Sequence, residues 1–246
     1  MSLLAIIGGT GLTSLQTLRI TRKAMVSTPW GEPSGPVTYG ELAGKDVLFL
    51  PRHGPGHTIP PHMINYRANI WALRQVGVSR VIAVAAVGGI HADLGPGQVA
   101  VPDQIIDYTY SRASTFFEEN LARVTHVDFT EPYCSELRAC LLQAAERSRV
   151  GLRDGGTYAA TQGPRLETAA EIRRLERDGC DMVGMTGMPE AGLAREAGLK
   201  YATCAVVANW AAGRHPGTIK MLDIDNTLRG AMENVRTLLA EAIPEL

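Results

Sequence analysis

The sequence predicts an α/β fold, formed as a single domain over residues 1–246 with a central mixed β-sheet flanked by helices. Short β-branched runs alternate along the chain with amphipathic segments, a pattern typical of a sheet covered by helices. The run VIAVAAV, residues 81–87, is apolar at every position, as expected of a strand that is buried on both faces. The 246 residues show no repeat and no stretch that resembles a domain linker, so we expect one domain.

The first strand is expected in MSLLAIIGGTG, where a short apolar run ends in glycine. This segment has no basic flank, so it is interpreted as a buried strand and not as a signal peptide. Six further short β-branched runs complete the expected sheet. The seven expected strands are Leu3–Ile7, Val47–Leu50, Arg80–Val87, Gln98–Val101, Thr157–Thr161, Cys180–Val183 and Tyr201–Ala208.

Amphipathic segments between these runs predict five helices. In chain order they are Asn65–Val76, Ser135–Arg149, Thr168–Asp178, Pro189–Glu196 and Ile224–Ala242. The Pro- and Gly-rich stretches Thr28–Gly40 and Pro51–Pro61 are expected to be loops.

The composition excludes several classes of partner. The net charge is −1, whereas proteins that bind a nucleic-acid backbone usually carry a basic excess, so no nucleic-acid partner is expected. A small anion is not excluded, because one or two arginines suffice to bind it. No run reaches the roughly 18 uncharged apolar residues of a membrane span. The four cysteines show no CxxC spacing and are expected to be reduced core thiols of a cytoplasmic protein.

Two motifs are suited to binding an anion. Gly8-Gly9-Thr10-Gly11 follows the first strand, where glycines let backbone N–H groups converge and a threonine adds a hydroxyl donor. It is neither G-x-G-x-x-G nor a P-loop, and a tight structural turn is an equal alternative. Arg52 and His53 follow the strand Val47–Leu50, at the sheet edge where α/β proteins bind ligands. The guanidinium can fork onto a phosphate and the imidazole can add a donor, the alternative being a surface salt bridge.

Three histidines within ten residues, His53, His57 and His62, raise the possibility of a metal site. The intervening prolines and glycines break helical spacing, and no acidic or cysteine ligand is near in the sequence. No metal is therefore expected.

Three later segments carry polar groups at element ends. Glu167 lies at a helix start, where the dipole favours a carboxylate, and from spacing alone helix capping is the stronger interpretation. Thr186 follows the strand Cys180–Val183 with methionines on both sides, which can fill the core or form an apolar floor for a flat ligand. Asn209 closes a buried strand and offers a donor and an acceptor to a purine edge, or else is a turn asparagine.

The ordered segments GGTGL, PRHG, NYRANIWAL, VGGI, GPRLET, GMTGMPE and ANWA resemble the trimeric purine nucleoside phosphorylase and methylthioadenosine phosphorylase family. The resemblance runs from about the first strand to the last helix. It implies a cytoplasmic homotrimer that splits a purine nucleoside with inorganic phosphate as co-substrate, with no cofactor and no metal.

The resemblance also implies roles for individual residues. Positions that bind phosphate in the family are matched by Thr10, Arg52, His53 and Thr186. Met185 matches the residue under the ribose and base, and Asn209 and Ala211 match the pair at the purine edge. His126 matches a segment that reaches into the site of a neighbouring subunit.

One departure from the family concerns phosphate. The family usually has a small hydroxyl or amide residue at the position of Ala85, which here offers only backbone. Either phosphate binds more weakly, or the backbone N–H of Ala86 supplies the contact.

A second departure concerns the base. Adenine-specific members place aspartates at the base-edge positions, which here are Asn209 and Ala211, whereas Glu167 and Asn209 fit the members that prefer 6-oxopurines. A carboxylate accepts from the N1–H of hypoxanthine and the amide donates to O6 and N7, but adenine presents an N1 acceptor that a carboxylate repels. Glu167 and Asn209 are therefore expected to be the catalytic residues that stabilise the departing base.

The segment Thr218–Leu222 aligns with the region at the 5′ end of the nucleoside. Ile219, Met221 or Leu222 there can face a methylthio group, which favours methylthioinosine over inosine as the substrate. A methylthioadenosine phosphorylase, a general 6-oxopurine nucleoside phosphorylase, a nucleoside hydrolase and a non-catalytic nucleotide-binding module remain as alternatives.

Overall fold

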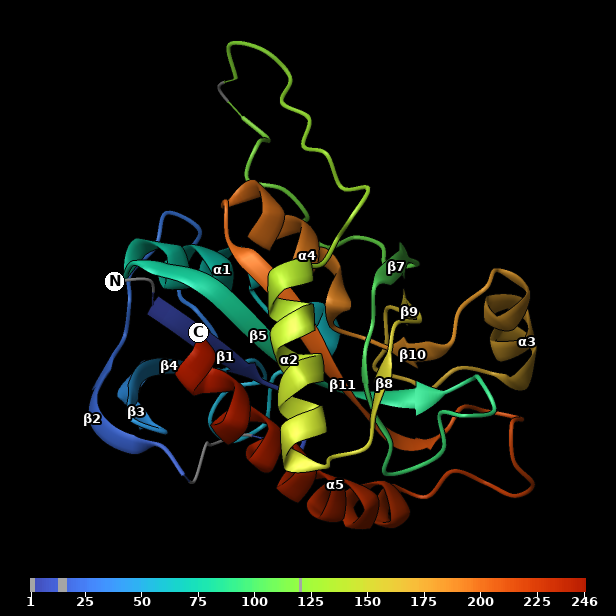
Figure 1. The fold of residues 1–246 in the computed structure, drawn as a ribbon. Helices are drawn as coiled ribbons and strands as arrows, with labels where there is room; N and C mark the ends of the chain where they lie inside the picture. The colour runs from blue at the N-terminus through green and yellow to red at the C-terminus, as the bar shows by residue number, and fades with distance from the viewer. Residues whose placement is uncertain (1–2, 13–16, 120) are drawn as a thin grey trace.

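The computed structural model describes residues 3–12, 17–119 and 121–246, and it confirms the predicted fold class. Within these residues, one mixed sheet of eleven strands is covered by five α-helices (Figure 1). The strands are β1 (Leu3–Gly8), β2 (Arg19–Ala24), β3 (Val37–Leu42), β4 (Lys45–Pro51), β5 (Val78–Gly89), β6 (Val99–Val101), β7 (Gln104–Asp107), β8 (Leu152–Asp154), β9 (Thr157–Ala160), β10 (Met182–Gly184) and β11 (Lys200–Trp210).

Strand β5 is the centre of the sheet. It pairs in parallel with both β1 and β11, and β1 pairs in parallel with β4. Near its end β5 also pairs with β10, which runs antiparallel to it. The sheet therefore branches at the end of β5, and the carboxyl ends of β4, β1, β5 and β11 lie along one edge.

Four of the five helices form two layers, and the fifth, α3 (Ala169–Arg177), packs apart from them (Figure 1). The other four are α1 (Tyr66–Gln75), α2 (Ser135–Ser148), α4 (Gly187–Glu196) and α5 (Met221–Ala242), with single 3₁₀ turns at Pro61–Met63 and Ile243–Glu245. Along β1, Leu4 and Ile6 pack in the core cluster of α2 and α5, while Ala5 and Ile7 pack in the cluster of α1 and α4. This alternation follows from the two-residue period of a strand.

The sequence analysis did not predict four of the strands, namely β2, β3, β7 and β8. Strand β2 reads RITRKA and is exposed over nearly its whole length, so it lacks the apolar run that predicts a strand. Strand β3 overlaps the end of the expected loop Thr28–Gly40, which is wrong from Val37 onward. Strands β7 and β8 have only four and three residues, and their pairing partners, not their composition, define them.

The expected helices are all present, with ends shifted by up to three residues. Helix α5 begins at Met221 and not at Ile224, and α4 begins at Gly187 and not at Pro189. Inside α4, Met188 has φ −119° and ψ 140°, which marks a kink where proline follows. The residue before a proline favours an extended backbone, so the sequence predicted that the helix begins at Pro189. The structure instead has one turn before this kink, beginning at Gly187.

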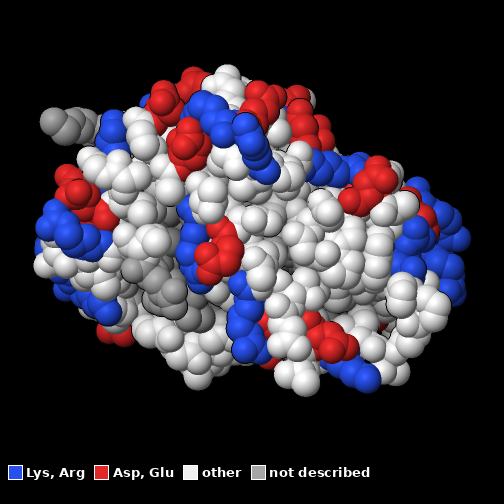
Figure 2. Space-filling view, turned by 60° about the horizontal axis from the view of Figure 1, so that its bottom comes forward, with Lys and Arg blue, Asp and Glu red and all other residues white. Residues whose placement is uncertain are grey.

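Charged side chains of both signs are interspersed on the face shown in Figure 2, as the near-neutral net charge indicates. Within the described residues, none of the helices has the length and apolar character needed to cross a membrane. All four cysteines carry free thiols.

Candidate active site

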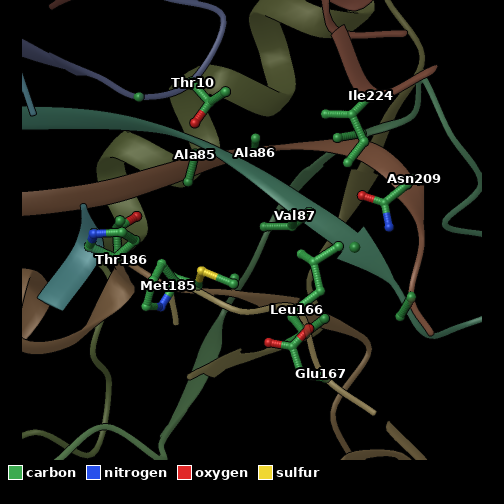
Figure 3. A pocket seen from close by; sticks show the side chains of 18 of the residues that line it. Thr10, Ala85, Ala86, Val87, Leu166, Glu167, Met185, Thr186, Asn209 and Ile224 are labelled. Carbon is green, nitrogen blue, oxygen red and sulfur yellow. The ribbon is translucent and has the colours of Figure 1, made fainter. Parts of the chain in front are cut away.

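A cavity of about 230 Å³ lies at the carboxyl ends of β1, β4, β5 and β11 (Figure 3). Nine of the ten residues to which the resemblance gave a role at phosphate or nucleoside line it: Thr10, Arg52, His53, Ala86, Glu167, Met185, Thr186, Asn209 and Ala211. Arg52 and Asn209, which follow different strands, thus line the same cavity. His126 is exposed on the segment between β7 and α2 and is not among the residues that line the cavity.

The glycine motif is both a tight turn and part of the cavity wall. The N–H of Leu12 donates to the carbonyl of Gly9 at 3.0 Å, which closes the turn, while Gly9 and Thr10 line the cavity. A Cβ at Gly9 would lie 2.6 Å from the carbonyl oxygen of Val84 and 2.7 Å from Nη1 of Arg52. Only glycine fits there, because the turn backbone lies directly against the arginine.

Arg52 is not part of a surface salt bridge. Its side chain is 1% exposed and forms a bidentate pair with Glu190, with Nε donating to Oε2 at 2.6 Å and Nη2 to Oε1 at 2.8 Å. Nη1 donates to the carbonyl of Val84 at 2.9 Å. The pair of guanidinium donors that the sequence analysis assigned to phosphate is therefore bound to Glu190. One N–H on each Nη is left for another acceptor.

Glu190 is a site residue that the sequence analysis missed. It is fully buried and also accepts a hydrogen bond from the Tyr201 hydroxyl at 2.8 Å. Burial opposes the charge of Arg52, but the carboxylate of Glu190 outweighs it and raises the pKa of the guanidinium. Glu190 lies in the first turn of α4, where a glutamate is usually exposed, so nothing in its sequence context indicated a buried partner.

His53 faces the cavity in its neutral form. Burial, assisted by the nearby charge of Arg52, lowers the pKa of His53 to about 4. Its Nδ1 lies 2.8 Å from the carbonyl of Ile59, which can only accept, so Nδ1 carries the hydrogen. Nε2 is then a hydrogen-bond acceptor, not the donor expected from the sequence. It suits a phosphate that still carries a proton.

This burial predicts an acid-sensitive fold. The unfolded imidazole titrates near its ordinary pKa, so below that pH the unfolded state binds more protons, and stability is lost as the pH falls toward 4. Through His53 alone, the free energy of unfolding is expected to fall by about 3 kcal/mol between about pH 7 and about pH 3.5. Chemical denaturation of wild type and His53→Asn across this range measures the effect, with the exposed His62→Asn as control. Equal acid slopes in wild type and His53→Asn would contradict it.

The three histidines of the sequence analysis are only partly brought together. The rings of His53 and His57 lie 4.6 Å apart, and His57 Nε2 is 3.5 Å from the hydroxyl of Thr10. Burial lowers the pKa of His57 as well. Among the described residues, no three His, Cys, Asp or Glu side chains are grouped so as to hold a metal ion.

Glu167 is not the cap of its helix. Thr168 caps α3 and forms a capping box with Glu171, so the capping interpretation of Glu167 is wrong. The carboxylate of Glu167 instead lines the cavity and accepts from the hydroxyl of Thr161 at 2.7 Å. That hydrogen bond fixes one oxygen and leaves the other for a ligand.

Asn209 is not a turn residue, because it lies inside β11. The pairing of β11 with β5 shifts register between Val207 and Asn209, which breaks the alternation of the strand. This bulge places the side chains of both Ala208 and Asn209 on the cavity. Nδ2 of Asn209 donates to the carbonyl of Trp210 at 2.7 Å, and its second hydrogen remains for a ligand.

The methionines on either side of Thr186 fit different interpretations, one lining the ligand cavity and the other filling the core. Met185 lines the cavity, whereas Met188 packs against the core. Gly163 has φ +61°, and a Cβ there would lie 2.4 Å from the sulfur of Met185. The glycine therefore makes room for the thioether at the cavity wall.

The apolar wall differs in part from the expectation. Ile219 and Met221 line the cavity, but Leu222 is 66% exposed and does not. Ile224, missed in the sequence, points into the cavity from α5 (Figure 3). The sequence analysis named Ile224 only as the first residue of the expected helix Ile224–Ala242. Ala85 also lines the wall and adds no polar side chain.

Comparison with known proteins identifies the relatives of this chain. Residues 3–244 match the family described as the phosphorylase superfamily. A Pseudomonas syringae pv. tomato protein named "Probable S-methyl-5'-thioinosine phosphorylase" is 53% identical over 243 residues, covering 99% of each chain. The 6-oxopurine nucleoside phosphorylase of Pyrococcus furiosus is 45% identical, covering 99% of this chain and 93% of its own. A solved methylthioadenosine phosphorylase from Schistosoma mansoni, in complex with adenine, superposes with a TM-score of 0.95 at 32% identity, covering 100% and 92%.

Proposed function

This chain belongs to the phosphorylase superfamily, and from that premise we propose that it splits S-methyl-5'-thioinosine with inorganic phosphate. The products are hypoxanthine and 5-methylthioribose 1-phosphate. The chain is a pentosyltransferase, and its substrates are a purine nucleoside and phosphate, as for the relatives named nucleoside phosphorylases.

The observation that carries the proposal is a cavity with different chemistry at its two ends. Thr10 and Thr186 lie at one side of the cavity, while Asn209 and Glu167 lie at the other (Figure 3). The first pair offers hydroxyl donors beside Arg52, and the second offers a carboxylate and an amide. A phosphate and a purine base can therefore be held at opposite ends, with the ribose between them.

At the phosphate end the charge of Arg52 is balanced by Glu190, so the oxyanion is held mainly by directed hydrogen bonds. Its donors are the free N–H groups of Arg52, the hydroxyls of Thr10 and Thr186 and, in place of a side chain at Ala85, the backbone N–H of Ala86. Neutral His53 accepts a hydrogen bond from a protonated phosphate oxygen. Fixed donors of this kind position the nucleophile for attack on the anomeric carbon.

At the base end, negative charge builds on the purine as the glycosidic bond stretches toward an oxocarbenium-like state. Asn209 donates to O6 and N7, and Glu167, held by Thr161, accepts from N1–H. Met185 lies under the ribose and base, and Ala211 leaves room at the purine edge. Donors aimed at developing charge act most strongly in the transition state.

The wall near the 5′ position supports the methylthio substrate. Ile219, Met221 and Ile224 line the cavity, and all three have apolar side chains. A methylthio group would pack against them, whereas the 5′-hydroxyl of inosine would lose its hydrogen bonds to water without a partner. This contact supports methylthioinosine over the general 6-oxopurine activity of the Pyrococcus furiosus relative.

A phosphate-dependence assay with three nucleosides in parallel tests the proposal. We expect the highest kcat/KM on methylthioinosine, a lower value on inosine and the lowest on methylthioadenosine, with no turnover in phosphate-free buffer. A higher kcat/KM on inosine or methylthioadenosine would show that methylthioinosine is not the preferred substrate. Turnover without phosphate would indicate a hydrolase. Tight binding without turnover would indicate a non-catalytic binding module.

We further propose that the active unit is a cytoplasmic homotrimer that uses no cofactor besides its co-substrate. The segment between β7 and α2 protrudes from the body of the protein and carries exposed His126, which supports its reaching the site of a neighbouring subunit (Figure 1). The free thiols of the four cysteines support a reducing compartment. Sedimentation equilibrium decides the assembly, and a monomer with full activity would contradict it.

A further inference from the structure

Arg112 makes more hydrogen bonds than the other arginines, and all of its partners are uncharged. It lies at the foot of the protruding segment and is half-buried. Its Nη1 donates to the carbonyls of Met185 at 2.9 Å and Met188 at 2.6 Å, and its Nη2 to those of Gln162 at 2.7 Å and Thr161 at 3.2 Å. Nε donates to the side chain of Gln162 at 3.1 Å. No carboxylate of the described residues pairs with it.

Three of the four carbonyls belong to two loops that bear cavity residues, and the fourth, that of Met188, lies in the first turn of α4. One loop follows β9 and carries Glu167, and Thr161, whose carbonyl Arg112 binds, also holds the Glu167 carboxylate. The other follows β10 and carries Met185 and Thr186. These loops come from separate strands, and one planar guanidinium joins them.

The same guanidinium contacts a third element. Nη1 lies 3.3 Å from the hydroxyl oxygen of Tyr66 in α1, and that hydroxyl donates in turn to the carbonyl of Pro61 at 2.9 Å. Pro61 lines the cavity as well. Without a cation at this point, several carbonyls that face one another would lose their donor, and each peptide would be free to rotate.

We propose that Arg112 is a positioning residue that fixes the base-recognising carboxylate of Glu167 relative to Met185 and Thr186, and thereby sets the selection of the purine base. Arg112 is not among the residues that line the cavity, and it acts through the loops it joins. The inference rests on the proposed function, in which Glu167 distinguishes hypoxanthine from adenine.

The test compares Arg112→Lys and Arg112→Ala with wild type. Lysine keeps the charge but has neither the planar fork nor enough donors to hold both loops. Because small misplacements of reacting groups are costly, kcat/KM on methylthioinosine is expected to fall about 10²-fold. The preference for methylthioinosine over methylthioadenosine is expected to shrink by about tenfold or more. Added guanidinium ion should restore part of the activity and selectivity of Arg112→Ala, with sodium chloride as the ionic-strength control.

Arg195 provides a matched control. It is also half-buried, and it donates to the carbonyls of Asp128, at 3.2 Å, and Glu131 at the other end of the same protruding segment. Arg195→Lys and Arg195→Ala are expected to leave base selection unchanged. Thermal unfolding of all four variants separates loss of fold from loss of positioning.

Calorimetric binding of free hypoxanthine and adenine keeps the inference separate from the proposed activity. If the wild-type protein shows no phosphorolysis, the proposed function is wrong. The inference about Arg112 is still tested in that case, because it depends on the relative affinity of the Arg112 variants for free hypoxanthine and adenine. Folded Arg112 variants with wild-type selectivity, or an equal loss on both bases, would overturn it. Failure of both variants to fold would also overturn it, since Arg112 would then be a structural residue.

Discussion

Replacing Arg52 by methionine is expected to lower phosphate-dependent kcat/KM by about 10³-fold, because the phosphate end of the cavity loses its guanidinium donors. The same change leaves Glu190 buried without its partner, and breaking a buried ion pair in this way costs about 3–5 kcal/mol of stability. Steady-state kinetics with varied phosphate and chemical denaturation measure the two effects separately.

The double variant Arg52→Met with Glu190→Gln distinguishes binding from folding. It removes both buried charges and keeps an oxygen that can accept from Tyr201. We expect it to recover much of the lost stability while its activity stays low, because neutralising a buried pair is far less costly than breaking it. A double variant with the wild-type KM for phosphate would show that Arg52 only stabilises the fold.

Replacing Asn209 by alanine is expected to lower kcat by about 10²-fold or more, by analogy with the loss of one oriented donor in a transition state. The fold should be little affected, because the side chain donates only to the neighbouring Trp210 carbonyl. Single-turnover kinetics on methylthioinosine measure the change.

Asn226→Ala is a suitable control, because this asparagine is exposed on α5 and bonds to Arg229. It should retain wild-type kcat. An unchanged kcat in Asn209→Ala would contradict the assignment of Asn209 to the departing base.

Sequence alone determined the fold class, the seven principal strands and the five helices, because these elements bury apolar residues with a clear period. It also pointed to Thr10, Arg52 and Asn209, which line one cavity, since polar residues that follow parallel strands meet at one edge of a sheet. The resemblance to the purine nucleoside phosphorylase family indicated that these residues bind phosphate and a purine base, which their spacing alone did not decide.

Tertiary structure alone decided the features that depend on contacts between distant segments. The partner of Arg52 is 138 positions away, and the carbonyls joined by Arg112 follow two different strands. The bulge that turns Asn209 into the cavity arises from pairing with β5, and the short strands exist only through their neighbours. A local pattern reports how a segment buries its own side chains, but a buried charge or a carbonyl cluster is stabilised by groups that only the folded chain brings within hydrogen-bond distance.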